Sequence, residues 1–411
     1  MPLDPRRTVA ELRELASLTG DHDGAQRLCW SPTWRTACEW FEGKLASLPV
    51  EVETDPAGNI WATLRGESDR ALLIGGHLDS VPNGGWLDGC LNVLAGLEVL
   101  RDLAARGRPP VTVRLVSWAD EEGARFGRSL VGSSAASGML DIELLRGLRD
   151  RQGAPLPEVL GANGVDLERM LEARGQLRDA AAYLELHIEH GPVLEELGLP
   201  LGVVLGTVGL QRHVVRFTGQ PAHAGSTPMR SRRDPFLSAA RLALETRRIA
   251  ITEQGVATTG ICVTRPGIPT AVAAECEITV DLRHADDGAL GRMLAAAVEA
   301  GRTIAGEEGV DVRWDRLFEM DAVNFDAGLI DLCEEAVVAA AGSSHRLFSG
   351  PLHDAVEAAR AGIPTAMIFV RSLRGLSHAK EEDTPEEDLE LAVRALALAA
   401  GKAIVRLSAS G

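Results

Sequence analysis

The sequence of 411 residues is poor in aromatic residues, which make up 4% of it and include a single tyrosine. Leucine, valine, isoleucine and alanine must therefore fill the interior, and a hydrophobic content of 45% is enough for a sizeable core. No apolar run is long enough to span a membrane. The first 18 residues are charged and amphipathic and lack the apolar stretch of a secretory signal. We therefore expect a cytoplasmic protein.

Positive charge is scarce, because 42 Lys and Arg residues face 59 Asp and Glu residues, which gives a net charge of −17. This balance argues against non-specific binding to nucleic acid or to anionic membranes, and we expect neither as a partner. The six cysteines are scattered without a Cys-x-x-Cys pair, so neither a zinc ribbon nor a disulfide framework is indicated. A small anionic substrate stays possible, provided that a local group of Arg and His side chains binds it.

Short, nearly continuous apolar runs alternate with helical patterns over much of the chain. After two amphipathic helices at about 8–18 and 32–47, such runs are typical of strands that are buried on both faces. We therefore predict an α/β domain with a mostly parallel sheet covered by helices. The expected strands cover residues 71–80, 111–123, 181–192 and 363–370.

The segment 208–322 has a different order of elements, in which a strand, a helix, two strands, a helix and a strand follow one another. That order is typical of the ferredoxin-like α+β unit. We therefore predict a discontinuous catalytic domain, residues 1–207 and 323–411, with a second domain, residues 208–322, inserted into it.

Histidines and carboxylates follow each of the four expected strands of the first domain. Since ligands of open α/β sheets bind beyond the carboxyl ends of the strands, we expect these side chains to meet at one edge of the sheet. They are His77 and Asp79 with Asp88 in the next loop, then Glu121 and Glu122, His187, and His378.

Three histidines with three carboxylates suit two divalent ions, and zinc, manganese, cobalt and nickel all fit. Asp88 lies in a glycine-rich loop, which favours it as the bridge between the ions. Asp79 lies two residues after His77 and so faces the same way on an extended chain; we predict that it accepts the second ring N–H of His77. Glu121 and Glu122 point in different directions, so one can bind metal while the other acts on water.

Six motifs carry a resemblance to a known family, from the segment Asp55–Asn59 almost to the C-terminus. They read GGHLDSVPNGGWLDG, ADEEGARF, ELHIEHGPVLE, AHAGSTPMRSRRD, HDA and GLSHAKEEDT. The chain resembles the M20-type metallo-amidohydrolases and, within them, the hydantoinase/carbamoylase branch. That branch includes N-carbamoyl-L-amino acid hydrolases, β-ureidopropionases and allantoate amidohydrolases.

The resemblance implies a role for each of these residues. His77, Asp88 and His187 would hold one ion, and Asp88, Glu122 and His378 the other, with Glu121 as general base for a metal-bound hydroxide. The inserted domain would serve as lid and dimerisation surface of a homodimer. His223 from the partner subunit would stabilise the oxyanion, and Arg283 would bind the substrate carboxylate. His353 would line the site or brace the fold.

The chain departs from the family mostly around the expected substrate. His190 stands where the family usually has Gln, and Thr270 where it usually has an Asn that binds the substrate carboxylate. Gln211 is shifted from the position of a family glutamine. Asn92 replaces a common Gly, and Arg371 a common Pro. The set of metal ligands is complete while the substrate contacts are altered.

The leading hypothesis is therefore hydrolysis of an N-carbamoyl-L-amino acid to the amino acid, carbon dioxide and ammonia. Allantoate, another ureido acid or an N-acyl amino acid are alternative substrates that the sequence does not separate. A catalytically silent homologue that binds a small acid is the non-enzymatic alternative, and Glu121 argues against it. His187 and its surrounding motif argue against an M20 dipeptidase.

Overall fold

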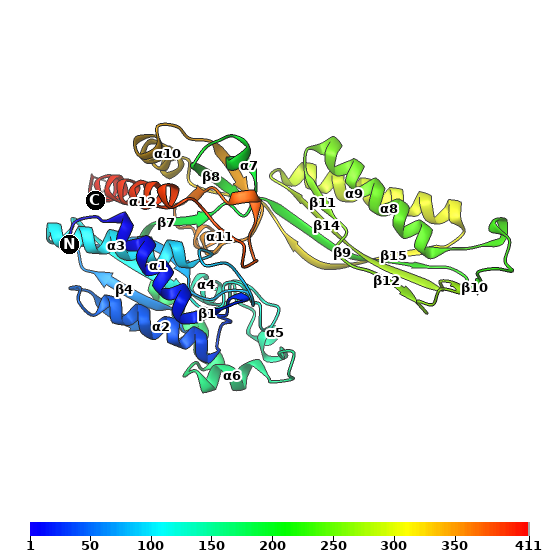
Figure 1. Ribbon diagram of the computed structural model, residues 1–411, viewed down its shortest axis with the longest axis horizontal. Helices are drawn as coiled ribbons and strands as arrows, with labels where there is room; N and C mark the ends of the chain where they lie inside the picture. The colour runs from blue at the N-terminus through cyan, green and yellow to red at the C-terminus, as the bar shows by residue number, and fades with distance from the viewer. Residues whose placement is uncertain (410–411) are drawn as a thin grey trace. The chain divides into compact units, whose positions relative to one another are not determined.

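The computed structural model describes residues 1–409, and the chain divides into two compact units. The main unit comprises Met1–Leu205 together with the chain from Asn324 onward, and the inserted unit comprises Gly206–Val323. Figure 1 shows that the chain leaves the main unit once and returns to it once.

A mixed sheet forms the centre of the main unit. Its four central strands, β18, β7, β5 and β6 in this spatial order, run parallel to one another, while β8, β4 and β3 continue the sheet with antiparallel pairs. The predicted α/β class with a mostly parallel centre is confirmed. The strands of this sheet are β3 (Glu51–Thr54), β4 (Ile60–Leu64), β5 (Ser68–His77), β6 (Val111–Trp118), β7 (Ala180–Ile188), β8 (Leu201–Thr207), β16 (Val323–Asn324) and β17 (Arg346–Ser349), which both pair with β8, and β18 (Thr365–Val370).

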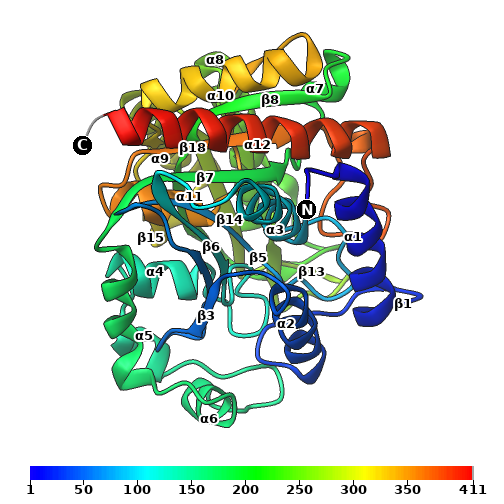
Figure 2. The same cartoon turned by 90° about the vertical axis from the view of Figure 1, so that its left-hand side faces the viewer.

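Helices cover both faces of this sheet because its central strands are apolar on both sides. Helices α3 and α12 pack together on one face, with α10 and α1 beside α12, and α11 and α4 lie against the other face (Figure 2). Among residues 1–409, no helix has the length and apolar character needed to cross a membrane. The helices of this unit are α1 (Pro5–Thr19), α2 (Pro32–Leu45), α3 (Cys90–Arg106), α4 (Val131–Ser137), α5 (Ile142–Arg146), α6 (Leu156–Ala162), α7 (Val193–Glu196), α10 (Ala327–Ala341), α11 (Asp354–Arg360) and α12 (Glu386–Ala409).

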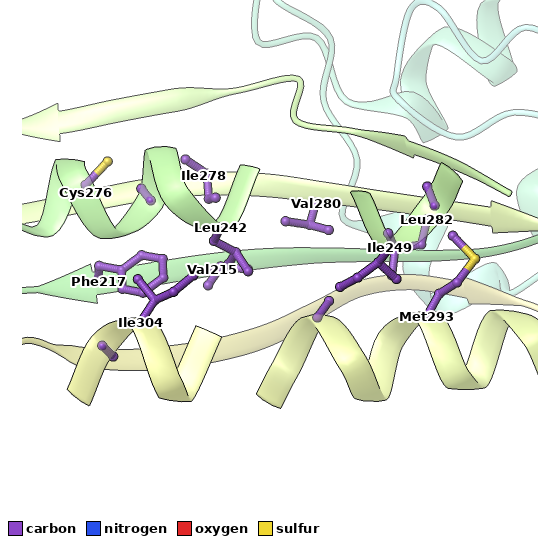
Figure 3. Close-up of a cluster of buried hydrophobic side chains, with 14 of the residues drawn as sticks. Val215, Phe217, Leu242, Ile249, Cys276, Ile278, Val280, Leu282, Met293 and Ile304 are labelled. Atoms are coloured by element: carbon purple, nitrogen blue, oxygen red, sulfur yellow. The ribbon is translucent and has the colours of Figure 1, made fainter. Parts of the chain in front are cut away.

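The inserted unit is a layer of two helices on an antiparallel sheet. Strands β9 and β14 alternate buried and more exposed residues, as expected for a sheet with one face in a core. Val215, Phe217 and Ile278 from these strands belong to one core cluster with Leu242 of α8, and Met293 of α9 lies at its other end near Ile249 and Leu282 (Figure 3). The elements are β9 (Gly209–Thr218), α8 (Pro235–Glu253), β11 (Val256–Thr258), β12 (Cys262–Arg265), β14 (Glu275–His284), α9 (Asp287–Glu308) and β15 (Asp311–Met320).

The spatial order of this sheet is β11-β14-β9-β15, and β12 also pairs with β14. The second strand expected from the sequence is thus split into β11 and β12, which share one partner strand. A separate two-stranded pair joins β10 (Ala222–His223) to β13 (Ala271–Val272). This pair carries His223 and lies next to Thr270.

Candidate metal centre

The polar ends of the four parallel strands meet at one edge of the sheet in the main unit. Since β18, β7, β5 and β6 are neighbours and run the same way, their carboxyl ends lie side by side. The side chains concerned are His77, the last residue of β5, Glu121 and Glu122 after β6, His187 near the end of β7, and His378 in the loop after β18.

Asp88, in the loop before α3, lies at the centre of this group. Its Oδ1 lies 3.6 Å from His77 Nε2 and 3.4 Å from His187 Nε2. Its Oδ2 lies 3.5 Å from His378 Nε2, and that nitrogen lies 3.5 Å from Glu122 Oε2. The two oxygens of one carboxylate thus face two different sets of nitrogen and oxygen atoms.

These separations have the size that a shared ion requires. Ligand atoms placed about 2.0–2.1 Å from a tetrahedral zinc ion lie about 3.4 Å from one another. His77, Asp88 and His187 provide such a group of three, with all three atoms within 4.8 Å of one another. A carboxylate that faces two ions from its two oxygens is the usual bridge of a dinuclear hydrolytic site.

Each buried imidazole is oriented by a backbone carbonyl. His77 Nδ1 lies 3.0 Å from the carbonyl oxygen of Asp79, and His187 Nδ1 lies 3.2 Å from that of Ile188. Because a carbonyl only accepts, Nδ1 carries the proton and the Nε2 lone pair faces the site. Burial lowers the pKa of His77 to about 4 and that of His187 to about 3, although Asp88 opposes the shift. Both rings are therefore neutral at pH 7, as metal ligands must be.

The hydrogen bond predicted from the His77 ring to the Asp79 carboxylate does not form, because Nδ1 lies 3.7 Å from Asp79 Oδ1. The strand β5 ends at His77, so the alternation of an extended chain does not reach Asp79. Its backbone carbonyl takes the ring N–H, and its carboxylate instead accepts the backbone N–H groups of Glu121, at 3.3 Å, and Glu122, at 3.2 Å. Asp79 thus orients the segment that carries both glutamates.

Among residues 1–409, no Lys or Arg forms an ion pair with the buried carboxylates of the site. Burial, and then the charges of Asp354 and Glu122, raise the pKa of Glu121 well above its usual range. Burial, and then Asp88, does the same to the pKa of Glu122. Asp88 differs, because its surrounding histidines outweigh burial and lower its pKa to about 2.

Three atoms of this group are buried and have no hydrogen-bond partner among the described residues: Asp88 Oδ2, Glu122 Oε1 and His187 Nε2. Buried polar atoms are normally satisfied, and buried charges are normally paired or bound to a metal. The donor set, carboxylate oxygen with imidazole nitrogen, suits zinc, manganese, cobalt or nickel. The residues present therefore fit a pair of divalent ions.

The loop that carries Asp88 is held by Glu382, which the sequence analysis did not identify. One oxygen of Glu382 accepts the backbone N–H groups of Leu87, at 3.2 Å, and Asp88, at 3.0 Å. A Cβ atom on Gly85 would lie 2.0 Å from this oxygen, so glycine is needed there. Glu382 stands four residues after His378 in the motif GLSHAKEEDT, and this proximity was the available signal.

Three strand ends next to the site enter the left-handed backbone region at residues other than glycine. Asp120 after β6, His190 after β7 and His378 after β18 have φ angles of 57°, 60° and 54°. Such conformations cost free energy and concentrate at functional sites.

The other predicted site residues of the inserted unit lie at two places within it. His223, on β10, is exposed, and its Nδ1 accepts the backbone N–H groups of Gly225 and Ser226 at 3.1 and 3.2 Å. Its proton is therefore on Nε2, which can donate. The backbone oxygen of Thr270 accepts the N–H of Ala224.

Arg283 and Gln211 lie instead on the neighbouring strands β14 and β9. Arg283 donates through Nε to Asp281 at 2.8 Å. Gln211 donates to Glu319, and its carbonyl oxygen lies 3.2 Å from His213 Nε2. The amide of Gln211 is thus engaged within its own unit.

His353 is buried in the main unit beside the metal ligands. Its ring centroid lies 4.4 Å from that of His187, and its Nε2 lies 3.0 Å from Ser349 Oγ. His353 thus both lines the group of histidines and has a partner of its own.

Removing the support of the Asp88 loop should weaken metal binding. We expect Glu382→Ala to lower the affinity for the ion pair about 10-fold or more, because two backbone donors that fix Asp88 lose their acceptor. Glu382→Gln keeps an acceptor oxygen and should retain most of the affinity. Calorimetric titration with Zn²⁺ measures both, and equal affinities of Glu382→Ala and the wild type would contradict this role.

The metal-free protein should lose stability as the pH rises from 6.5 to 8. Burial is the largest cause that raises the pKa of Asp79, Glu185 and Glu382 to about 8. In this pH window the folded protein keeps protons that the unfolded chain has already released, so the free energy of unfolding falls as the pH rises towards 8. The lowered pKa values of His77 and His187 instead increase the free energy of unfolding as the pH rises, because only the unfolded histidines still release protons. Above about pH 6.5 the unfolded histidines are also neutral, so this contribution no longer changes with pH. Each carboxyl changes the free energy of unfolding by at most about 1.4 kcal/mol per pH unit.

Melting temperatures of chelator-treated and Zn²⁺-loaded protein over this pH window test the expectation. The metal-free protein should melt at progressively lower temperature, and the loaded protein should change less because cations offset the buried negative charge. A constant melting temperature of the metal-free protein would show that these carboxyls are not held protonated.

Comparison with known proteins agrees with this geometry. The model of peptidase family M20/M25/M40 matches residues 73–402. The chain is 36% identical over 390 residues to an N-carbamoyl-L-amino acid amidohydrolase of Geobacillus stearothermophilus, which covers 91% of this chain and 92% of that protein. It is 33% identical over 405 residues to an allantoate amidohydrolase of Escherichia coli K12, which covers 96% of this chain and 97% of that protein.

Solved structures of similar fold also come from amidohydrolases. An amidase of the hydantoinase/carbamoylase family from Burkholderia multivorans superimposes with a TM-score of 0.88, at 32% identity over 97% of both chains. A second member of that family, from Burkholderia ambifaria, superimposes with a TM-score of 0.86 at 33% identity over 97% of both chains. The chain therefore belongs to peptidase family M20/M25/M40 and, within it, to the hydantoinase/carbamoylase group of amidohydrolases.

Proposed function

We propose that the protein uses two divalent ions to hydrolyse the C–N bond of an N-carbamoyl-L-amino acid, releasing the amino acid, carbon dioxide and ammonia. The observation that carries the proposal is that the two carboxylate oxygens of Asp88 face two different groups of ligand atoms, and that Glu121 lies beside them. Glu121 Oε2 lies 3.7 Å from His77 Nε2, and its side chain is not itself needed in either group. It is therefore available for proton transfer.

Each residue has a distinct task in this reaction. The ions, when bound, supply Lewis-acid activation of water and of the substrate carbonyl. Glu121 accepts a proton from the attacking water and later delivers it to the leaving nitrogen. Asp79 keeps Glu121 and Glu122 in their places through the two backbone N–H groups. Glu121 would be held in its ionised form, which a base requires, by the positive charge of ions bound at Asp88.

The names of the relatives support a ureido or carbamoyl acid as substrate, because both N-carbamoyl-L-amino acids and allantoate contain the H₂N–CO–NH group next to a carboxylate. Allantoate or another ureido acid is therefore the second candidate. Hydrolysis of an N-acyl amino acid is a third, since it breaks the same kind of amide bond. A silent homologue is disfavoured by Glu121, which a simple binding protein does not require.

The first test is ammonia release by the metal-loaded protein. The panel comprises N-carbamoyl-L-amino acids, 3-ureidopropionate, allantoate and N-acetyl amino acids, with free amino acid measured in parallel. We expect turnover on a carbamoyl or ureido acid and a loss of about 10²–10⁴-fold in Glu121→Gln, because the proton acceptor is gone. Glu172→Gln, a surface change, serves as the matched control and should keep full activity.

Each outcome assigns the chemistry differently. Amino acid without ammonia would move the assignment to an N-acyl hydrolase. No turnover on the whole panel by protein with two bound ions would contradict the proposed function.

We further propose a homodimer in which the inserted units meet, so that His223 serves the partner's site. Helix α8 exposes Leu237, Leu244 and Ile251, which recur every seven residues and so form one stripe along the helix. The strands β11 and β12 beside it expose Val256 and Val263. Contiguous apolar surface of this kind is typical of a protein interface. The Nε2 proton of His223 suits it to stabilise a developing oxyanion.

Mixing two inactive variants tests both the dimer and the role of His223. Glu121→Gln and His223→Ala subunits, mixed equally and allowed to exchange, should regain about a quarter of wild-type activity, because half of the dimers then contain one intact site. The same mixture carrying Leu244→Asp and Ile251→Asp should not regain activity, since the stripe is disrupted. No recovery in the first mixture, with exchange verified by light scattering and mass spectrometry, would place His223 in its own subunit's site or outside any site.

A further inference from the structure

Five histidines gather around Asp88, although the two ligand groups described above use only three of them. His353 and His190 are the additional ones. His190 follows β7, which ends at Ile188. Its side chain is 8% exposed, so the imidazole is effectively inside the site.

The ring of His190 lies next to Asp88, His187 and His378. Its Nε2 lies 3.8 Å from Asp88 Oδ1. The ring stacks on that of His187 at 5.0 Å between centroids with a 26° angle between planes, and meets that of His378 edge-on at 5.6 Å. Asp88, His190 and His378 each present one potential ligand atom, and these three atoms lie within 4.8 Å of one another.

The backbone keeps the ring in this position. His190 has a φ angle of 60°, and its N–H donates to Ser372 Oγ at 3.1 Å. The preceding Glu189 accepts the N–H groups of Val193 and Leu194 at the start of α7. The loop is thus fixed on both sides of a strained residue, and strain of this kind is kept where the side chain has a task.

A structural role does not explain the ring. Buried imidazoles are normally hydrogen-bonded, as His353 is to Ser349. Within residues 1–409, neither ring nitrogen of His190 makes a hydrogen bond; its one polar contact is with Asp88. A second possible group, His187, His190 and His353, contains no carboxylate to balance a divalent charge, and Ser349 already occupies Nε2 of His353.

We propose that His190 is an additional metal ligand, which joins Asp88 and His378 so that two imidazoles hold the second ion. The inference rests on the proposed dinuclear site and adds a ligand to it. Nitrogen ligands suit zinc, nickel and cobalt, whereas manganese prefers oxygen. Compared with a glutamine at this position, His190 should therefore shift the preference of the site away from manganese.

The test compares the wild type with His190→Gln, which keeps a polar side chain of similar size and so should fold. Metal-free proteins are titrated separately with Zn²⁺ and Mn²⁺, and metal content is measured after exposure to both ions at equal concentration. Visible spectra of the Co²⁺-loaded proteins report the number of nitrogen ligands independently of activity. His345→Gln is the matched control, because His345 belongs to none of the ligand groups found in the described part of the chain.

We expect the wild type to bind two ions, and His190→Gln to bind two ions with the weaker zinc affinity reduced about 10-fold or more while manganese changes less. The Co²⁺ bands should shift in His190→Gln and not in His345→Gln. Unchanged affinities, selectivity and spectrum in His190→Gln would overturn the role of His190 while leaving the dinuclear site intact. A wild type that binds fewer than two ions would instead overturn the dinuclear site itself.

Discussion

The buried negative charge at the carboxyl edge of the parallel strands is the constraint on which the rest of the site depends. Asp88, Glu121 and Glu122 are removed from water, and no Lys or Arg among the described residues forms an ion pair with them. Ionised carboxylates in such surroundings need a cation of some kind. The neutral imidazoles of His77 and His187 present nitrogen ligands beside these carboxylates. Burying the carboxylates together costs free energy in the absence of a cation, and a bound cation would offset that cost.

The positions of these groups follow from the sheet. Parallel neighbours bring four chain segments to one edge, and each segment then uses a local device to aim its side chain. These devices are the carbonyl of Asp79 for His77, the carboxylate of Asp79 for the two glutamates, and Glu382 for the Asp88 loop. Precision in the site thus depends on residues that need not touch an ion.

The sequence was sufficient for the α/β class and for the group of residues that meets at the sheet edge, because apolar runs followed by His, Asp or Glu mark strand ends directly. It was insufficient for contacts that depend on backbone direction beyond a strand. Asp79 lies past the end of β5, where alternation no longer applies, and its carbonyl, not its carboxylate, accepts the ring N–H of His77. His190 turns towards Asp88 only because its φ angle is positive, and Glu382 reaches Leu87 and Asp88 across nearly 300 residues of sequence.

The order of the ligands along the chain has a consequence for how the site is assembled during synthesis. His77, Asp88 and His187, which form one group, all precede the inserted unit, whereas His378 follows it. Strand β18, which pairs with β7 on one side and β8 on the other, is also made late. A growing chain therefore contains His77, Asp88 and His187 before the inserted unit is made, and of the other proposed group only His378 comes after it. The proposed second ion has a complete set of ligands only once the inserted unit, β18 and His378 have been made.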